Sequence, residues 1–189
     1  MNKKKILGYA VGPIGSGLLG FISLPIVTWF YSVEDIGRIS MLQIYISFCI
    51  LLFCFGLDQA YVREYHESTN KGELLNSLSF PTIMITVICL IGLLLFSPSF
   101  ISIHLYNIDS AYLSIITVSA FFAAVISRYL ALILRMQEKA LQFSMSQILP
   151  KILFLIFLVN VVVFDVARNT ESLVTANALS IIAACSIYI

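Results

Sequence analysis

Residues 81–96, PTIMITVICLIGLLLF, contain no charged side chain. A helix that crosses the roughly 30 Å hydrocarbon core of a bilayer needs about 20 mostly apolar residues, and this run supplies most of them. Similar runs recur along the chain between short polar breaks. They predict an all-α, polytopic transmembrane bundle of about six helices, at residues 6–30, 39–55, 81–96, 111–134, 148–164 and from 173 onward.

The overall composition points to the same class of protein. Of the 189 residues, 60% are apolar and 11% are charged, and the mean hydropathy is +0.99. A soluble domain typically carries about a quarter charged residues, and it rarely exposes large apolar patches. The net charge of +1 indicates no basic surface of the kind that binds nucleic acid. We therefore expect an integral membrane protein without a nucleic-acid partner.

The distribution of Lys and Arg predicts a cytoplasmic N-terminus. With that orientation, eight of these residues fall in cytoplasmic segments, where membrane proteins collect them, against two outside, Arg38 and Arg168. The eight are Lys3, Lys4, Lys5, Arg63, Lys71, Arg135, Lys139 and Lys151. Arg128 lies inside the fourth expected span.

The last expected helix runs to the final residue and ends in AACSIYI, without a polar or basic anchor. Helical membrane proteins usually carry such anchors at the ends of their spans. We therefore expect residues 1–189 to form a single bundle, the N-terminal half of a longer transporter, truncated in its sixth helix.

Small residues line one face of the first expected helix. Gly8, Gly12, Ser16 and Gly20 recur every four residues and form a stripe along which another helix can approach closely. The segment 15–20, GSGLLG, also matches a dinucleotide-binding pattern, but that pattern needs a preceding strand and a helix that opens within it. The stripe is interpreted as a packing surface, and no nucleotide cofactor is expected.

Residues 56–67, GLDQAYVREYHE, form the densest cluster of ionisable groups in the chain. If the second helix ended just before this segment, Asp58 would lie at the negative C-terminal pole of that helix, which is unfavourable for a carboxylate. We therefore expect the helix to continue to about Tyr65, with Arg63 and Glu67 on one polar face. An interfacial helix end with a solvated ion pair and a substrate-facing role are both compatible with this pattern.

Two polar side chains within the expected spans are singled out, Arg128 and Asn160. Arg128 is expected roughly 10 Å from the end of its helix, at about 1.5 Å per residue, and a charge at such depth is costly. Its neighbours Ala124 and Ala131 give this face small side chains. The guanidinium could hold an anionic headgroup such as a diphosphate, or it could extend to the cytoplasmic interface. Asn160 is expected to form a hydrogen bond between helices.

Sequence signatures of enzymes are missing. The chain contains no H-E-x-x-H, no G-x-S-x-G and no P-loop pattern. Its four cysteines lack the paired short spacings of a zinc or redox site. We expect no enzymatic activity, no catalytic residues, no cofactor and no metal.

Three segments resemble one known family. They are GPIGS at residues 12–16, YSVEDIGR at 31–38 and GLDQAYVREY at 56–65. In order and character they are similar to the start of a polysaccharide-biosynthesis (O-antigen) flippase of the Wzx type, within the multidrug/oligosaccharidyl-lipid/polysaccharide exporter superfamily. The resemblance covers the whole chain and is strongest from residue 12 to residue 65.

The resemblance implies two helical bundles around a cavity that opens alternately to either face of the bacterial inner membrane. The cargo would be an undecaprenyl-diphosphate-linked oligosaccharide for O-antigen or capsule synthesis. Membrane lipid and other membrane proteins of polysaccharide assembly are the further partners it implies. On this basis Arg63 and Arg128 are candidates for headgroup contact, and Asp58 and Glu64 are candidate charge partners or proton-sensitive groups. Arg128 is selected by its depth and not by a family motif.

Three other functions stay open at this point. A transporter of another substrate in the same superfamily, such as a cationic drug, would favour acidic cavity groups over arginines. A membrane-embedded enzyme of glycan assembly would need a clustered catalytic set or a large polar external loop. A non-transporting assembly subunit would leave the charge of Arg128 unexplained.

Overall fold

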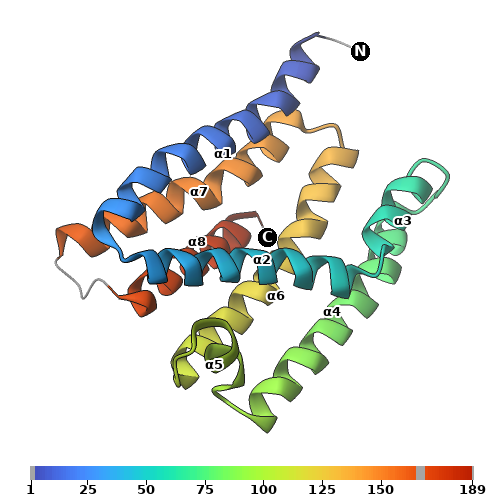
Figure 1. Cartoon of the computed structure of the whole chain (residues 1–189). Coiled ribbons are helices and arrows are strands. Elements are labelled where there is room, and N and C mark those ends of the chain that lie inside the picture. The colour runs from blue at the N-terminus through green and yellow to red at the C-terminus, as the bar shows by residue number, and fades with distance from the viewer. Residues whose placement is uncertain (1–2, 165–168, 189) are drawn as a thin grey trace.

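The structure, a computed structural model, describes residues 3–164 and 169–188. Within these ranges the chain is all-helical and contains no strand, which confirms the predicted fold class. Six of its helices are long and apolar enough to cross a membrane, and α3 and α5 are short. Figure 1 shows their arrangement. In chain order the helices are α1 (Lys3–Phe30), α2 (Val33–Cys54), α3 (Leu57–Glu64), α4 (Lys71–Phe96), α5 (Phe100–Tyr106), α6 (Ala111–Met136), α7 (Ala140–Val163) and α8 (Thr170–Tyr188).

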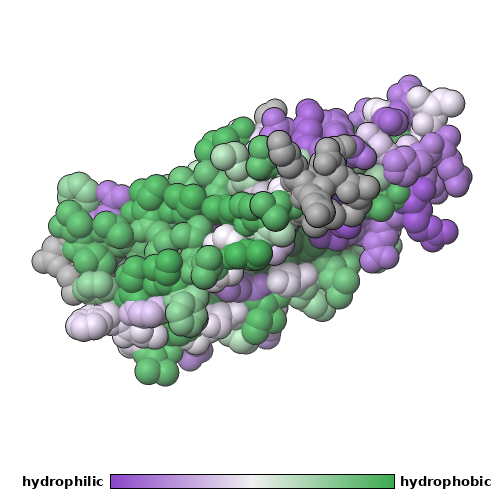
Figure 2. Space-filling model, turned by 90° about the horizontal axis from the view of Figure 1, so that it is seen from above, coloured by the Kyte–Doolittle hydropathy of each residue, from purple (hydrophilic) through white to green (hydrophobic). Residues whose placement is uncertain are grey.

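The outer surface of the bundle is apolar over most of its length. Large hydrophobic side chains are exposed along every long helix, among them Phe21 at 74%, Leu51 at 76% and Leu95 at 80%. Figure 2 shows this green surface, with hydrophilic side chains gathered at the end of the molecule where α3 lies. An apolar surface of this extent is unfavourable in water and is stable in contact with the hydrocarbon core of a bilayer. The chain is a multi-pass membrane protein.

Helices α6 and α8 form the centre of the bundle, and the other spans pack around them. The largest core cluster joins α2, α4, α5, α6 and α8 and includes Leu42, Tyr106, Leu113 and Val174. A second cluster joins α1, α2, α7 and α8 around Leu158. Helix α1 touches the rest of the bundle chiefly through α7, beside which it runs in Figure 1.

Glycines on α1 allow this close approach to α7. A Cβ added to Gly12 would lie 2.8 Å from the Cα atom of Ser144, and one added to Gly15 would lie 2.8 Å from a side-chain carbon of Ile148. Ser144 also donates a hydrogen bond to the carbonyl oxygen of Gly8. The stripe predicted from the sequence is therefore correct for Gly8 and Gly12.

The second half of the predicted stripe does not pack in this way. A Cβ added to Gly20 would meet nothing within 4 Å. The hydroxyl of Ser16 donates to the carbonyl of Pro13 in its own helix, at 3.1 Å. The contact face follows Gly8, Gly12 and Gly15 because residues spaced by alternating three and four positions stay on one side of a helix with about 3.6 residues per turn.

Three helices, α2, α4 and α7, begin six or more positions earlier than the hydropathy predicted. The side chains of Ser32 and Asn70 cap α2 and α4 by accepting hydrogen bonds from the N–H groups of Asp35 and Glu73. Helix α7 begins at Ala140 and not at residue 148. The polar residues that sequence reasoning assigned to loops form the first turns of these helices, and in α2 and α4 the capping side chains satisfy one of the free N–H groups. Helix α7 begins without a side-chain cap.

The second helix ends where the sequence predicted it would continue. Phe55 and Gly56 both adopt left-handed backbone conformations, with φ of 47° and 77°, and a new helix, α3, starts at Leu57. From the sequence, a helix end at this point predicts that Asp58 lies at a C-terminal pole. Asp58 instead lies in the first turn of α3, where the helix dipole stabilises a carboxylate.

Candidate functional site

Two adjoining cavities form a groove between α2 and α7, with α8 as its floor. The first, of about 260 Å³, is also bounded by α6 and is lined by Arg128 among others. The second, of about 300 Å³, is lined by polar side chains from all three helices. The two cavities adjoin, because both are lined by Ile46, Gln147, Pro150 and Ile181; we term them together the α2–α7 groove.

Arg128 lies in this groove at the end next to α3. Its Nη2 and Nε atoms donate to Oδ2 of Asp58 at 2.8 and 3.1 Å. The Asp58 side chain is 9% exposed, whereas that of Arg128 is 46% exposed. The guanidinium is therefore anchored along one edge, and its remaining N–H donors are open to a further acceptor.

The ion pair joins residues 70 positions apart in the chain, on α3 and α6. It agrees with the expectation that Asp58 is a charge partner of an arginine. At about 1.5 Å per residue, Arg128 lies about 12 Å from the C-terminal end of α6. The separate helix α3 is what brings the carboxylate to this depth, because the break at Gly56 turns the chain back toward α6.

Arg63 and Glu64 do not join this site. Both side chains are exposed on α3, and neither lines the α2–α7 groove. Among the described residues Arg63 forms no ion pair, so the predicted pairing along the polar face is not seen. Their roles in headgroup contact stay predictions.

The buried face of α3 is aromatic. Tyr61 and Tyr65 are 2% and 6% exposed, and their rings meet edge to face with centroids 5.6 Å apart. The Nζ atom of Lys71 lies 4.5 Å above the ring of Tyr65, which is a cation–π contact. Burial raises the pKa of the Tyr61 hydroxyl, so it stays neutral. These contacts hold α3 against α4 and α6 and thereby position Asp58.

Lys151 is a second charged residue in the groove, and sequence reasoning placed it in a cytoplasmic segment. Because α7 begins at Ala140, Lys151 lies about 16 Å along that helix, close to the middle of a core of roughly 30 Å. Within the described ranges it forms no ion pair and no hydrogen bond. The charged residue nearest the centre of a membrane helix is a candidate functional residue by default.

Beside Lys151 the groove is lined by Asn177, whose side chain carries an unsatisfied polar atom. Asn177 of α8 is 6% exposed, and its Oδ1 atom is buried without a hydrogen-bond partner in the described chain. Gln43 and Ser47 of α2 and Gln147 of α7 line the same part of the groove. Hydropathy did not single out these four residues, because Gln43, Ser47 and Asn177 are polar side chains inside apolar runs and Gln147 comes just before the expected start of its span.

A hydrogen-bonded cluster closes the opposite end of α2 and α8. Asp35 accepts hydrogen bonds from Ser32 at 2.6 Å and from Thr170. Arg38 donates to Thr170 at 2.8 Å and lies 3.8 Å from Asp35. Arg38 was predicted to lie in an external loop but belongs to α2, while Arg168, also predicted there, lies outside the described residues. The cluster holds the two helix ends together.

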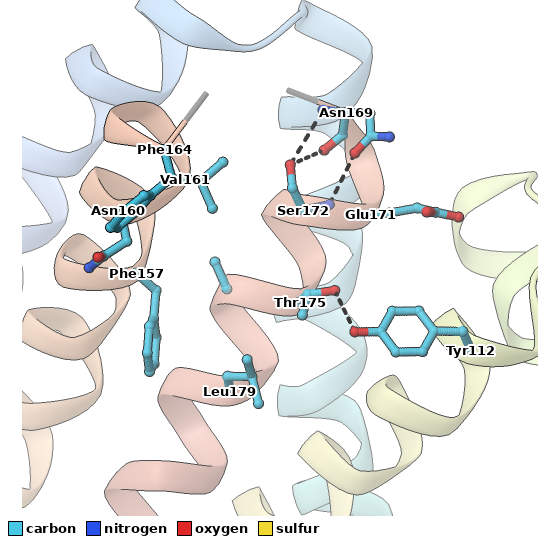
Figure 3. A pocket seen from close by; sticks show the side chains of 11 residues that line it. Tyr112, Phe157, Asn160, Val161, Phe164, Asn169, Glu171, Ser172, Thr175 and Leu179 are labelled. Atoms are coloured by element: carbon cyan, nitrogen blue, oxygen red, sulfur yellow. Dashed lines mark hydrogen bonds between the residues drawn. The ribbon is translucent and has the colours of Figure 1, made fainter. Parts of the chain in front are cut away.

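A larger cavity, of about 530 Å³, lies at this same end between α6, α7 and α8. Figure 3 shows Tyr112 reaching across it to Thr175, with an oxygen–oxygen distance of 3.4 Å. Asn160 lines the cavity, but its amide donates to the carbonyl of Ile156 in its own helix. The prediction that Asn160 bonds to another helix is therefore wrong.

Comparison with known proteins adds one finding. A family model described as polysaccharide biosynthesis protein matches residues 3–189. The chain belongs to the polysaccharide biosynthesis protein family. No curated protein and no solved structure matches it. The family match agrees with the resemblance drawn from the three sequence segments at the level of polysaccharide synthesis and export.

Proposed function

We propose that this polysaccharide biosynthesis protein translocates an undecaprenyl-diphosphate-linked oligosaccharide across the bacterial inner membrane, as one helical bundle of a two-bundle transporter. The N-terminus would be cytoplasmic, and the protein would not be an enzyme. The observation that carries this proposal is Arg128: a guanidinium about 12 Å inside a span, half exposed in a groove.

A cation at this depth needs a compensating partner, because a charged side chain within the bilayer costs at least about 3 kcal/mol. Asp58 supplies part of that compensation. It engages only one edge of the guanidinium, and the planar guanidinium is suited to bidentate binding of phosphate oxygens. A diphosphate entering the groove could therefore bind the open edge of Arg128.

The position of this site also fits entry from the cytoplasmic side. The N-terminal end of α1, α3 and the turn between α6 and α7 lie toward one end of the molecule in Figure 1. Tyr9 and Arg135 link two of these elements through a hydrogen bond of 3.3 Å. Most Lys and Arg residues outside the spans belong to this end, which is typical of the cytoplasmic side.

The experiment that tests the proposal is deletion of the gene in its own bacterium, with extraction of lipid-linked sugars and assay of surface polysaccharide. We expect loss of surface polymer and accumulation of lipid-linked repeat units in the cytoplasmic leaflet. Complementation with the native gene should restore the polymer. Complementation with Arg128→Gln should restore much less, and Arg128→Lys should be intermediate because Lys keeps the charge without the bidentate geometry.

Arg135→Gln is the matched control, because Arg135 belongs to the same helix and is exposed but does not line the groove. It should complement like the native gene. Unchanged surface polymer after deletion, or lipid-linked units that are never made, would overturn the proposal. The first result would favour another cargo, and the second would favour an enzyme of glycan assembly.

A further inference from the structure

The cavity of about 530 Å³ between α6, α7 and α8, termed here the three-helix cavity, differs in charge from the α2–α7 groove. Arg128 and Lys151 line the groove, whereas no Lys or Arg is among the described residues that line the three-helix cavity. The charged side chain in that lining is Glu171, which is exposed and has no ion-pair or hydrogen-bond partner in the described chain. By charge, this cavity disfavours an anionic cargo and favours a ligand with a cationic group.

The other polar groups of the cavity already use part of their donor capacity. The Nδ2 atom of Asn160 donates to the carbonyl oxygen of Ile156 at 2.7 Å, which leaves its Oδ1 atom as an acceptor. The hydroxyls of Tyr112 and Thr175 lie 3.4 Å apart, so one of their two hydrogens is engaged between them. The carboxylate of Glu171 only accepts hydrogen bonds. The lining is therefore suited to a ligand that carries N–H donors.

The three-helix cavity is polar near the end of the bundle and apolar toward the middle of the membrane. On α8, Glu171 and Thr175 lie about 2 Å and 8 Å from the helix start, and Leu179 lies about 14 Å from it, at about 1.5 Å per residue. Figure 3 shows Phe157 of α7 and Leu179 on the side of the cavity away from Glu171. A phospholipid has the same order, with a polar headgroup at the membrane surface and acyl chains toward the middle.

We propose that the three-helix cavity binds a phospholipid whose headgroup carries a primary ammonium, phosphatidylethanolamine, from the periplasmic leaflet. The ammonium donates to the carboxylate of Glu171, and an acyl chain lies against Phe157 and Leu179. The volume of about 530 Å³ is within the roughly 300–1,000 Å³ typical of small-molecule pockets. The site does not depend on the proposed cargo, and only its leaflet follows from the proposed cytoplasmic N-terminus.

A lipid fits this position better than a protein helix does. A helix packed over the cavity would remove the carboxylate of Glu171 from water, which is unfavourable unless that helix supplies a cation. An ethanolamine headgroup supplies the cation and stays in the hydrated interface. Helices α6 and α7 pack chiefly on α8 and touch each other little, so a lipid in the cavity would contact all three. Its binding should therefore stabilise the bundle.

The test uses the full chain in detergent micelles and three phospholipids with identical acyl chains. Phosphatidylethanolamine carries a cationic N–H donor, phosphatidylcholine keeps the cation without any N–H, and phosphatidylglycerol has no cation. Native mass spectrometry measures bound lipid, and circular dichroism measures the melting temperature. We expect phosphatidylethanolamine to bind at least about fivefold more tightly than the other two and to raise the melting temperature most.

Two substitutions in the cavity separate the headgroup from the acyl chain. Glu171→Gln keeps the size of the side chain and removes its charge, so it should abolish the preference for phosphatidylethanolamine. Leu179→Trp fills the deeper part and should weaken binding of all three lipids. Glu34→Gln is the matched control, because Glu34 is exposed in the first turn of α2 and does not line the cavity. It should change none of the three affinities.

The outcomes also test a purely structural role of Glu171, since the helix dipole favours a carboxylate in the first turn of α8. Such a role predicts that Glu171→Gln lowers the melting temperature without lipid and leaves the lipid preference unchanged, and this result would refute the proposal. Equal binding of the three lipids by the native protein would refute it too. A dimer without bound lipid would mean that a second copy covers the cavity, which also overturns it.

Glu171→Gln and Glu34→Gln change exposed side chains, so the comparison between them decides the test even if Leu179→Trp does not fold. None of these variants alters Arg128 or the α2–α7 groove. Failure of the lipid site therefore leaves the proposed function standing, and failure of the gene-deletion experiment leaves the lipid site standing.

Discussion

The contact between α1 and α7 allows a quantitative test with Gly12→Ala. An alanine Cβ at this position would lie 2.8 Å from the Cα atom of Ser144 and 3.0 Å from its Oγ atom. The first of these is a backbone atom of a helix and cannot rotate away. The two helices must therefore separate slightly along the line where Ser144 donates to Gly8.

The expected loss follows from two opposing terms. Overpacking of a well-packed contact costs about 1–3 kcal/mol, and replacing glycine by alanine within a helix recovers about 0.5–1 kcal/mol. We therefore expect Gly12→Ala to lower the free energy of unfolding by about 0–2.5 kcal/mol, with the centre of this range near about 1 kcal/mol. The measurement is unfolding of the full chain in detergent micelles, by heat or by added dodecyl sulfate, followed by circular dichroism.

Gly20→Ala is the control within the same helix, because its Cβ would meet nothing within 4 Å. It should leave the free energy of unfolding unchanged or raise it by up to about 1 kcal/mol. The four-residue spacing in the sequence predicts the same packing role for Gly12 and Gly20, whereas in the structure only Gly12 lies against α7. Equal changes in the free energy of unfolding for the two substitutions would refute the packing of α1 on α7 described above.

Three further predictions concern the polar clusters. Asp58→Asn should lower the free energy of unfolding by about 1–3 kcal/mol, because it removes the carboxylate that compensates Arg128 inside the span. Titration with dodecyl sulfate measures the change, and an unchanged free energy of unfolding would contradict this compensating role. Thr170→Val keeps the shape of the side chain but leaves the buried Asp35 with one hydrogen-bond donor fewer. We expect it to lower the free energy of unfolding by about 1–3 kcal/mol in the same assay. An unchanged free energy of unfolding would mean that the hydrogen-bonded cluster of Asp35 and Thr170 does not stabilise the fold. Burial raises the pKa of Tyr106 to about 12, so the native state holds that proton more tightly than the unfolded chain does. Its contribution to stability is complete below about pH 10 and is lost as the pH rises toward 12, and Tyr106→Phe should flatten the decline in melting temperature over this window.

The fold class was predictable because the bilayer restricts the backbone conformations that a membrane-spanning segment can adopt. Backbone groups in hydrocarbon must bond within their own segment, so each long apolar run had to be a helix. The residues at which those helices begin and end could not be predicted as well from the sequence. Capping by Ser32 and Asn70 extends α2 and α4 beyond the apolar runs, and hydropathy does not report capping.

The candidate site was predictable only in part. Arg128 was found because an arginine inside a span is conspicuous. Lys151 was missed because its depth depends on where α7 begins, and α7 begins eight positions earlier than residue 148. Asn177 was missed because one asparagine in an apolar helix gives no sign of whether its amide has a partner. A systematic check of every polar residue inside an apolar run would have listed both.

By itself the sequence determined that this is a helical membrane protein, which residues carry charge within it and, through the family match, that it belongs to polysaccharide biosynthesis. Only the tertiary structure decided which of those charged residues form an ion pair. The left-handed turn at Phe55 and Gly56 ends one helix and starts another, and this turn places Asp58 against Arg128. Pairing between residues so far apart depends on how helices pack and rotate against one another, and that is a property of the assembled bundle and not of any one segment.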